Sequence, residues 1–538
     1  MAVKIKPWTI PFLFALIILS AIKIEAQPVR GFNLSDVKIL DGPFLIAQQA
    51  DLNYILALDP DRLLAPYLKD AGITPLKDNY SNWESSGLNG HTGGHYLSAL
   101  SLMYAATGME ELSTRLNYMI KWLDSCQQKN GNGYVGGIPD GQAFWKEIAA
   151  GNTKAVQSRW VPLYNIHKLY AGLYDAYRLA GNEKAFGILV NLSDWFYNLA
   201  QKLTDDQIQE ILKTEHGGLN EVFAQVAKIT GNKKYLELAI RMSERSILNP
   251  LIRQKNELTG KHANTQIPKI IGFKYIADAT GKPDWDSASV FFWNTVINRW
   301  TVSIGGNSIR EHFHSPDDFS AMVSHNQGPE TCNTYNMLKL TQLLYFSDPQ
   351  TKYMDYYEKA LFNHILSSVH PVKSGFVYFT PMRPRHYRVY SQAQESFWCC
   401  VGTGMENHAK YGEMIYAHDD NNLFVNLFIA SALNWKEKEL NLTQYTKFPY
   451  ENFSVLKIQT HEPIKMSLKI RKPVWAIERE IKVYVNNKIT SNYTVQDNFI
   501  TLARTWTNGD EVKIEMPMHV NLEYLPDGSS WASVKYGP

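Results

Sequence analysis

Three of the four cysteines in the chain lie in two short motifs, one of which also contains a glutamate. Cys399 and Cys400 are adjacent within residues 395–408 (ESFWCCVGTGMENH), and Cys332 follows Glu330 by two positions in GPETCN. Zinc accepts four ligands in a tetrahedron, with thiolate sulfur at ~2.3 Å and carboxylate oxygen at ~2.0–2.2 Å. Three thiols and one carboxylate supply such a set, which favours a metal site or a catalytic thiol site.

Disulfide bonding and inert burial are the alternatives for these cysteines. Disulfides are the usual fate of cysteines in an exported chain. Adjacent cysteines, however, pair with each other only through a strained ring, so the spacing leaves both interpretations open. The remaining cysteine, Cys126, ends an amphipathic run and is expected to be a small core residue.

A second set of polar residues lies in segments rich in glycine and asparagine. Glu311 follows a Gly-Gly pair in IGGNSIREHF. Glycine allows a substrate to approach the backbone, so Glu311 suits a general acid or base, although a solvated or ion-paired glutamate is the plainer alternative. Five histidines occur in similar contexts at expected helix starts, namely His91, His95, His167, His216 and His262. We expect these histidines to bind substrate hydroxyls, while ordinary packing stays open for each one singly.

His91 and His95 also have the spacing of two metal ligands on one helix. The two glycines between them, Gly93 and Gly94, argue against a regular helical turn at this place. The sequence therefore favours hydrogen bonding to substrate over metal binding for this pair.

The elements that must position these residues are mainly helical from residue 44 to about 412. Apolar residues recur there at spacings of three and four. Three of the predicted helices end in Thr-Gly, at Gly108, Gly231 and Gly281, where glycine can adopt the left-handed cap conformation. The recurrence indicates stacked helical hairpins. We favour a closed double ring over an open solenoid, because the polar segments fall at loops and helix starts.

From about residue 421 the pattern changes to short alternating segments. Apolar and polar residues alternate in residues 423–432, 453–460, 466–473, 481–487 and 512–517, which predicts an antiparallel β-sandwich. Residues 32–40 are expected to add a strand to it. The chain stops just after the strand-like residues 530–535, so we expect the sandwich to be incomplete.

Composition and the N-terminal segment set the remaining expectations. The chain has 538 residues and a formal net charge of +2, which provides no electrostatic case for binding nucleic acid or an acidic membrane. A basic start, an apolar run over residues 9–22 and a small residue at Ala26 predict a signal peptide, with an uncleaved anchor as the alternative because Ile24 is large. We expect a periplasmic or extracellular protein that does not bind the membrane after cleavage. Its predicted parts are a signal peptide (1–26), a strand or linker (27–43), a mainly α domain (44–418) and a β-sandwich domain (419–538).

Taken together, these motifs resemble the β-L-arabinofuranosidases of glycoside hydrolase family 127 and the related family 146. The resemblance is carried by ETCNTYNMLKL from Glu330, the Cys399-Cys400 pair, the loop that leads to Glu311, and HANTQIPK from His262. It covers roughly residue 32 to the C-terminal end. It implies an (α/α)6 barrel followed by β-sandwich domains, in a family whose members are usually longer at the C-terminus.

The resemblance also implies roles for individual residues. It implies that zinc is bound by Glu330, Cys332, Cys399 and Cys400. In this family Cys399 would be the nucleophile and Glu311 the acid/base of a retaining hydrolase that releases β-L-arabinofuranose from plant-derived glycans or glycopeptides. His167, His216 and His262 match positions that hold the sugar, and we add His95 from its context.

The implied chemistry agrees with general principles. A retaining glycosidase needs an acid/base and a nucleophile ~5–5.5 Å apart, and metal binding would keep a thiol deprotonated at neutral pH. Two other functions stay open at this stage. One is a two-carboxylate hydrolase or lyase on another glycan with structural cysteines, and the other is a carbohydrate-binding scaffold without catalysis.

Overall fold

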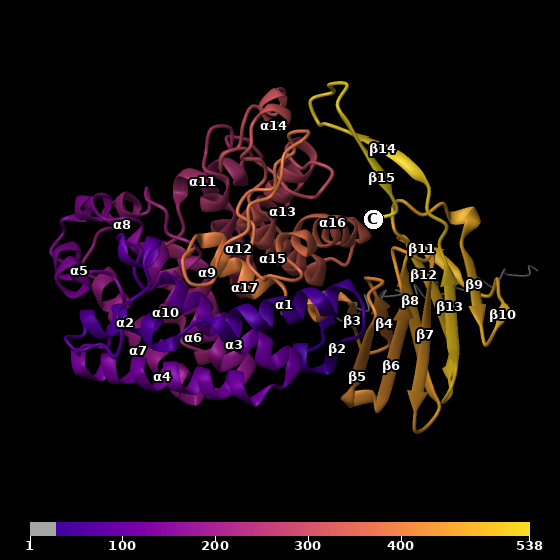
Figure 1. Ribbon diagram of the computed structural model, residues 1–538, viewed down its shortest axis with the longest axis horizontal. Coiled ribbons are helices and arrows are strands. Elements are labelled where there is room, and N and C mark those ends of the chain that lie inside the picture. Colours follow the sequence, from indigo (N-terminus) through magenta and orange to yellow (C-terminus); the bar gives the residue numbers. More distant parts are fainter. Residues whose placement is uncertain (1–27) are drawn as a thin grey trace, which may run out of the picture.

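The structure, a computed structural model, describes residues 28–538. The predicted signal peptide at residues 1–26 lies outside the described residues, as does the first position of the predicted linker. Within the part that the structure describes, no helix is both long enough and apolar enough to cross a bilayer. Helices occupy most of the chain up to residue 407, and strands occupy most of the rest (Figure 1).

The helices are, in chain order, α1 Pro43–Ala57, α2 Pro60–Asp70, α3 His91–Thr107, α4 Glu110–Asn130, α5 Gly141–Ala149, α6 Pro162–Ala180, α7 Glu183–Ala200, α8 Asp205–Ile211, α9 Leu219–Thr230, α10 Lys233–Arg241, α11 Arg245–Ile252, α12 Ala263–Thr280, α13 Pro283–Arg299, α14 Ser320–Ser324, α15 Thr331–Ser347, α16 Thr351–Ala360 and α17 Cys399–Asn407.

Six helices within residues 28–538 form a closed inner ring. Going around it, α3 packs on α6, α6 on α9, α9 on α12, α12 on α15, α15 on α17, and α17 returns to α3. The helices α4, α7, α10, α13 and α16 each follow an inner helix in sequence and pack on its outside, and α1 supplies the outer partner of α17. The chain therefore closes its sixth helix pair with its first helix. This double ring is the (α/α)6 barrel that the sequence predicts.

The first turn of α3 corrects one expectation. We expected its two glycines to prevent a regular helical turn, but the helix begins before them. A Cβ on Gly94 would lie only 2.3 Å from the backbone of Lys168, so the missing side chain allows α3 and α6 to pack closely. The carboxylate of Glu84 accepts hydrogen bonds of 2.8 Å from the backbone amides of Gly90 and Thr92. These bonds satisfy amides that have no partner within the helix.

The predicted glycine caps are confirmed. Gly108, Gly231 and Gly281 follow α3, α9 and α12 in the left-handed conformation, with φ of 71°, 68° and 68°. Cys126 is fully buried in α4, as its place in an amphipathic run predicts.

The strands are β1 Arg30–Gly31, β2 Val37–Ile39, β3 Tyr416–His418, β4 Asn422–Val425, β5 Ser431–Trp435, β6 Leu440–Thr446, β7 Phe453–Thr460, β8 Ile464–Arg471, β9 Lys482–Val485, β10 Lys488–Ile489, β11 Thr494–Gln496, β12 Phe499–Trp506, β13 Glu511–Glu515, β14 Val520–Tyr524 and β15 Ala532–Tyr536.

Two sheets form the β-sandwich beside the barrel (Figure 1). Their strand orders are β1-β3-β4-β8-β12-β11 and β10-β9-β13-β7-β6-β5-β2. All neighbouring strands in these sheets are antiparallel except β4 and β8, which are parallel. The N-terminal strands β1 and β2 each occupy an edge of one sheet, which confirms that residues 32–40 contribute a strand. The segment before the barrel and the segment after it therefore both contribute strands to the sandwich.

Arg471 on β8 connects the sandwich to outer helix α16. Its side chain is fully buried, and its Nη1 lies 2.7 Å from Oδ1 of Asp355. The same guanidinium pairs with Glu358, and its Nε donates a 2.6 Å hydrogen bond to the backbone oxygen of Asn426. A buried cation with two carboxylate partners fixes how the two parts meet.

The last two strands leave the sandwich. β14 and β15 form their own two-stranded sheet, which reaches toward the barrel near α14 (Figure 1). The backbone amide of Phe319 donates a 2.9 Å hydrogen bond to Asp527 in the hairpin, and the hydroxyl oxygens of Ser303 and Ser533 lie 2.7 Å apart. The hairpin therefore packs on the segment that carries Glu311.

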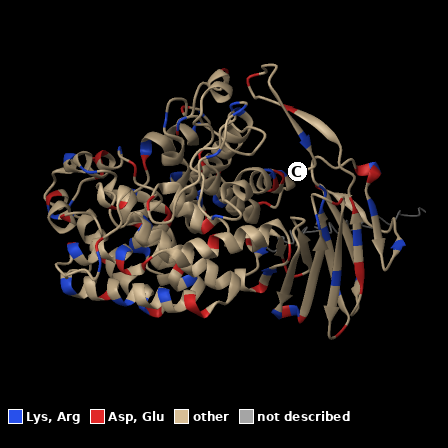
Figure 2. Ribbon diagram, in the orientation of Figure 1, with Lys and Arg blue, Asp and Glu red and all other residues tan. Residues whose placement is uncertain are grey.

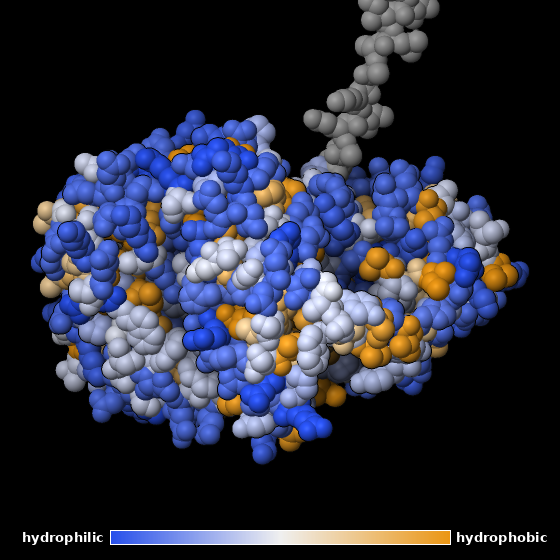
Figure 3. Space-filling view, turned by 90° about the horizontal axis from the view of Figure 1, so that it is seen from above, coloured by the Kyte–Doolittle hydropathy of each residue, from blue (hydrophilic) through white to orange (hydrophobic). Residues whose placement is uncertain are grey.

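The surface is mixed in charge. Lysine and arginine alternate with aspartate and glutamate over both the barrel and the sandwich (Figure 2). Seen from above, hydrophilic residues cover most of the molecule, and hydrophobic ones gather in the half that contains the sandwich (Figure 3). Val520, Leu522 and Val534 of the hairpin are among the exposed apolar residues.

Candidate active site

The six inner helices begin at one end of the barrel. His91, the first residue of α3, places its Nε2 3.0 Å from the backbone oxygen of Phe397, just before α17. Asn165 in the first turn of α6 donates a 2.8 Å hydrogen bond to the backbone oxygen of Asn89, just before α3. Helix starts carry partial positive charge, so their convergence favours anionic groups at this end.

Glu330, Cys332, Cys399 and Cys400 come together here and are named the Cys–Glu cluster below. Glu330 directly precedes α15 and Cys332 lies in its first turn, while the two adjacent cysteines begin α17. One ligand atom from each of the four residues lies within 4.8 Å of all the others. All four cysteines of the chain are free thiols, so the disulfide alternative is not observed.

The cluster fits a metal ion. An ion bound at ~2.3 Å to sulfur and ~2.1 Å to oxygen in a tetrahedron separates its ligand atoms by roughly 3.5–3.8 Å. Oε1 of Glu330 lies 3.8 Å from Sγ of Cys399 and 3.7 Å from Sγ of Cys400, and those two sulfurs are 4.0 Å apart. Sγ of Cys332 lies 2.9 Å from Sγ of Cys400, which is closer than two sulfurs on one ion. The second carboxylate oxygen of Glu330 is buried without a hydrogen-bond partner. A buried, unpaired carboxylate oxygen is costly unless a cation accompanies it.

The three thiols differ in their electrostatic surroundings. Hydrogen bonds from Cys332 and Cys400 hold the pKa of the Cys399 thiol well below its usual range, although burial opposes this. Burial raises the pKa values of Cys332 and Cys400. Cys399 is also the most exposed of the three, so it is the sulfur best placed to react with a substrate.

Glu311 lies beside the cluster in a strained loop. Ser308, Arg310 and Glu311 all have positive φ, at 70°, 49° and 68°. Left-handed backbone at non-glycine residues is uncommon and is often retained at functional sites. The backbone oxygen of Glu311 accepts a 2.7 Å hydrogen bond from the amide of Ala263, which joins this loop to the start of α12. The carboxylate is thereby held near His262, whose Nε2 lies 3.7 Å from its Oε2.

Tyr378, which no sequence motif indicated, connects Glu311 to Cys399. Its hydroxyl donates a short hydrogen bond to Oε1 of Glu311 and lies 3.6 Å from Sγ of Cys399. A single phenol oxygen can contact both groups only if they are close, which agrees with the ~5–5.5 Å expected between the two catalytic groups of a retaining glycosidase. Tyr378 stands in the apolar run FVYFT, which has no local signal of a functional tyrosine.

The predicted sugar-binding histidines occupy different depths. The side chain of His262 is 29% exposed and faces Glu311. His167 is buried next to Gly217 and Gly218, the residues after His216. His216 is fully buried, with its Nε2 3.6 Å from Oε2 of Glu244. The geometry links His262 directly to the acid/base candidate, and the sugar-binding roles of the four histidines stay predictions.

His95 belongs to a buried network behind the cluster. Its Nδ1 lies 2.5 Å from Oε1 of Glu406, and the hydroxyl of Tyr335 donates to the other carboxylate oxygen. Burial opposes the charge on Glu406, but its hydrogen bond to His95 lowers its pKa to about 2. Because Glu406 lies on α17 and Tyr335 on α15, this carboxylate ties together the two helices that carry the cysteines. Glu406 follows Cys399 by seven residues, a spacing of two helical turns that could have identified it.

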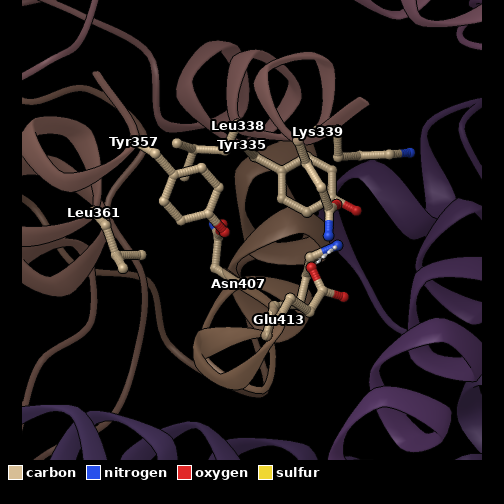
Figure 4. A pocket seen from close by; sticks show the side chains of 9 residues that line it. Tyr335, Leu338, Lys339, Tyr357, Leu361, Asn407 and Glu413 are labelled. Atoms are coloured by element: carbon tan, nitrogen blue, oxygen red, sulfur yellow. Dashed lines mark ion pairs between the residues drawn. The ribbon is translucent and has the colours of Figure 1, made fainter. Parts of the chain in front are cut away.

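These two helices pack tightly one layer behind the cluster. Figure 4 shows Tyr335 and Lys339 of α15 facing Asn407 of α17 and Glu413, with Tyr357 and Leu361 on the other side. The space between these side chains is only about 10 Å³, on the order of one water molecule. Such packing holds the two cysteine motifs at a fixed separation.

A larger cavity of about 1150 Å³ runs inside the ring. Its lining includes His167 and Lys168 near the start of α6 and Arg178 near the end of that helix. Lys339 and Glu221 also line it and form an ion pair of 2.9 Å. The barrel is thus hollow behind the site, and charged side chains line part of its inner wall.

Two family descriptions match the sequence. The catalytic domain of the β-L-arabinofuranosidases of glycoside hydrolase family 127 matches residues 36–413, and the middle domain of the same family matches residues 422–518. A search of curated proteins gave no match.

Solved structures share the architecture. A GH127 β-L-arabinofuranosidase from Geobacillus stearothermophilus T6 is 18% identical, with a TM-score of 0.72, over 93% of this chain and 85% of the other. A GH127 β-arabinofuranosidase is 16% identical, with a TM-score of 0.74, over 95% of this chain and 84% of the other. A third structure, a glycoside hydrolase, is 16% identical with a TM-score of 0.68, over 95% and 82%. At these identities the likeness establishes the fold, a mainly α (α/α)6 barrel followed by a β-sandwich.

Proposed function

The chain belongs to glycoside hydrolase family 127, the β-L-arabinofuranosidases, and on this basis we propose that it removes β-L-arabinofuranose from plant-derived glycans or glycopeptides with retention of configuration. Cys399 is the nucleophile and Glu311 the acid/base. The observation that carries the proposal is the contact of one tyrosine hydroxyl, that of Tyr378, with both groups.

In the first step the sulfur of Cys399 attacks the anomeric carbon of the arabinofuranosyl group. The bond from that carbon to the glycosidic oxygen breaks, and Glu311 gives its proton to the departing oxygen. A sulfur–carbon bond joins the sugar to the protein. Tyr378 orients the Glu311 carboxyl group, because its hydroxyl donates a hydrogen bond to that group.

In the second step water attacks the same carbon from the side that the leaving group vacated. Glu311 takes the proton of the water, and the sulfur leaves as a thiolate. Two inversions at one carbon return the original configuration. Both catalytic groups are then in their starting states.

We propose that the metal ion is Zn²⁺, bound by Glu330, Cys332, Cys399 and Cys400. When bound, zinc would keep the thiols deprotonated and oriented at neutral pH. The set of three sulfurs and one oxygen supports this choice, since soft thiolates favour zinc over magnesium or calcium. We also propose that His262, His167, His216 and His95 contribute to sugar binding, that arabinose-containing oligosaccharides or polysaccharides are the substrates, and that the protein is exported to the periplasm or the cell exterior.

A chromogenic β-L-arabinofuranoside tests the proposal. Cys399→Ala and Glu311→Gln should each abolish release of the chromophore, and proton NMR of the first sugar formed by the wild type should show the β anomer. Cys126→Ala is the matched control, because this cysteine is buried in α4 and lies outside the cluster. Full activity in Cys399→Ala would exclude the mechanism, as would activity that survives both chelation and thiol alkylation.

Metal analysis and cell fractionation test the remaining points. One zinc per chain is expected in the purified protein, and loss of that metal is expected in Cys400→Ser. Export predicts that the mature protein appears outside the cytoplasm without its first residues, which N-terminal sequencing of the recovered protein measures.

A further inference from the structure

Four aromatic rings form a continuous series from the molecular surface to the catalytic sulfur. The centroid of Trp160 lies 4.9 Å from that of Trp83, Trp83 lies 6.4 Å from Tyr378, and Tyr378 lies 6.0 Å from Trp398. Each ring is thus within the distance at which aromatic side chains interact with the next ring of the series. We name them the aromatic run.

The inner end of the run is part of the catalytic site. Trp398 directly precedes Cys399 and caps the start of α17. Tyr378 contacts both Cys399 and Glu311 through its hydroxyl. The inner end of the run therefore lies at the place where the glycosidic bond would break.

The outer end of the run is exposed and yet fixed. Trp160 is 39% exposed. The next residue, Val161, has φ of 40°, a rare conformation for a β-branched side chain. Gly87, at φ of 115°, lies against Trp160, since a Cβ there would be 3.5 Å from the Cβ of Trp160. Asn82 also has positive φ, and its side chain donates a 3.1 Å hydrogen bond to the backbone oxygen of Glu395, near the cysteine pair.

Packing alone does not account for this arrangement. A tryptophan that only fills a core is mostly buried, whereas Trp160 presents more than a third of its surface to solvent from a strained backbone. The exposed residues beside the two tryptophans in sequence are largely neutral and polar, including Asn82, Ser85, Ser86 and Ser158. Aromatic faces combined with neutral hydrogen-bonding groups suit a sugar ring.

The position of the run indicates which part of the substrate it contacts. Glu330, Cys332, Cys400 and His91 surround the sulfur and are fully buried, so the arabinofuranosyl group that reacts must occupy the deep end. The rest of the substrate has to extend toward exposed residues. We propose that Trp83 and Trp160 form a subsite that stacks against the sugar ring to which the arabinofuranose is linked, so that the enzyme prefers a glycan to a glycosylated peptide.

This inference rests on the proposed function, and the test separates the two. Three substrates with the same β-L-arabinofuranosyl group are compared: the methyl glycoside, a disaccharide with a pyranose leaving group, and the hydroxyproline glycoside. Turnover of the methyl glycoside by the wild type tests the proposed function alone. The ratio of kcat/KM for the disaccharide to that for the methyl glycoside tests the subsite.

Trp160→Ala should lower kcat/KM for the disaccharide about 10-fold, the loss of one stacked ring, and leave the methyl glycoside within about 2-fold. Trp83→Ala should act in the same direction, and Trp160→Phe should restore most of the ratio. Tyr450→Ala is the control, because Tyr450 is 81% exposed on the sandwich.

Three outcomes would overturn the subsite. The first is an unchanged kcat/KM ratio in Trp160→Ala, and the second is an equal loss of kcat/KM on all three substrates. The third is a loss of kcat/KM on the hydroxyproline glycoside alone, which would mean that the aromatic run contacts peptide. If the wild type turns over none of the substrates, calorimetry of the disaccharide decides: binding that Trp160→Ala weakens about 10-fold supports the subsite, and equal binding refutes it.

Discussion

Replacing Tyr378 by phenylalanine removes one oxygen from the position where the two proposed catalytic groups meet. That oxygen donates a short hydrogen bond to Glu311 and lies 3.6 Å from the sulfur of Cys399. A hydrogen bond to a group that carries charge contributes about 1.5–3 kcal/mol. If the bond is retained in the transition state, its loss should lower kcat/KM by about 10- to 100-fold.

The assay is steady-state hydrolysis of a chromogenic β-L-arabinofuranoside, together with zinc content and thermal unfolding. Zinc content should not change, because Tyr378 is outside the Cys–Glu cluster. Tyr345→Phe is the matched control. Tyr345 lies near the end of α15, far from the cluster, and its hydroxyl donates a 2.8 Å hydrogen bond to Asn426. This variant should therefore lose a buried hydrogen bond without losing activity. A Tyr378→Phe enzyme within about 2-fold of the wild type would refute the reasoning, as would equal losses in the two variants.

Three further outcomes are expected. Arg471→Met should destabilise the protein by about 3–5 kcal/mol, because it leaves the buried carboxylate of Glu358 and the half-buried one of Asp355 without their cation. Thermal unfolding measures this, with Arg504→Met as the control, because the side chain of Arg504 is 40% exposed. The contribution of His216 and Glu244 to stability should fall as the pH drops from about 6.5 to about 2. Burial lowers the pKa of His216 to about 4. Burial opposes the charge on Glu244, but His216 and Lys269 lower its pKa to about 2. Both groups therefore bind fewer protons in the folded state than in the unfolded state. Urea unfolding of the wild type and of Glu244→Gln at a series of pH values measures this contribution, and the stability difference between the two should shrink as the pH falls below about 4.5. Chelation should abolish activity, lower the unfolding temperature and make three thiols reactive, and added zinc should reverse all three effects.

The start of α3 differs from what its sequence predicts. Its apolar periodicity and its terminal glycine predicted the helix, but the two glycines in its first turn predicted the wrong start. Local conformational preference disfavours glycine in a helix. That preference was overridden by close packing against Lys168 of α6 and by the amide contacts of Glu84. The contact with Lys168 joins residues far apart in the chain, so it is not visible from the residues around His91.

What the sequence determined by itself was the ligand chemistry and the order of the parts. The residue types alone say that thiols and a carboxylate are present as possible ligands. The change from helical to alternating periodicity near residue 421 marks where helices give way to strands, because each kind of element buries one face. Tertiary structure decided the rest, because it depends on contacts between residues far apart in the chain. Only the meeting of the segments before α15 and α17 at one end of the barrel brings Tyr378, Glu311 and Cys399 to one place. Only the packing of α15 on α17 turns two separate motifs into one cluster.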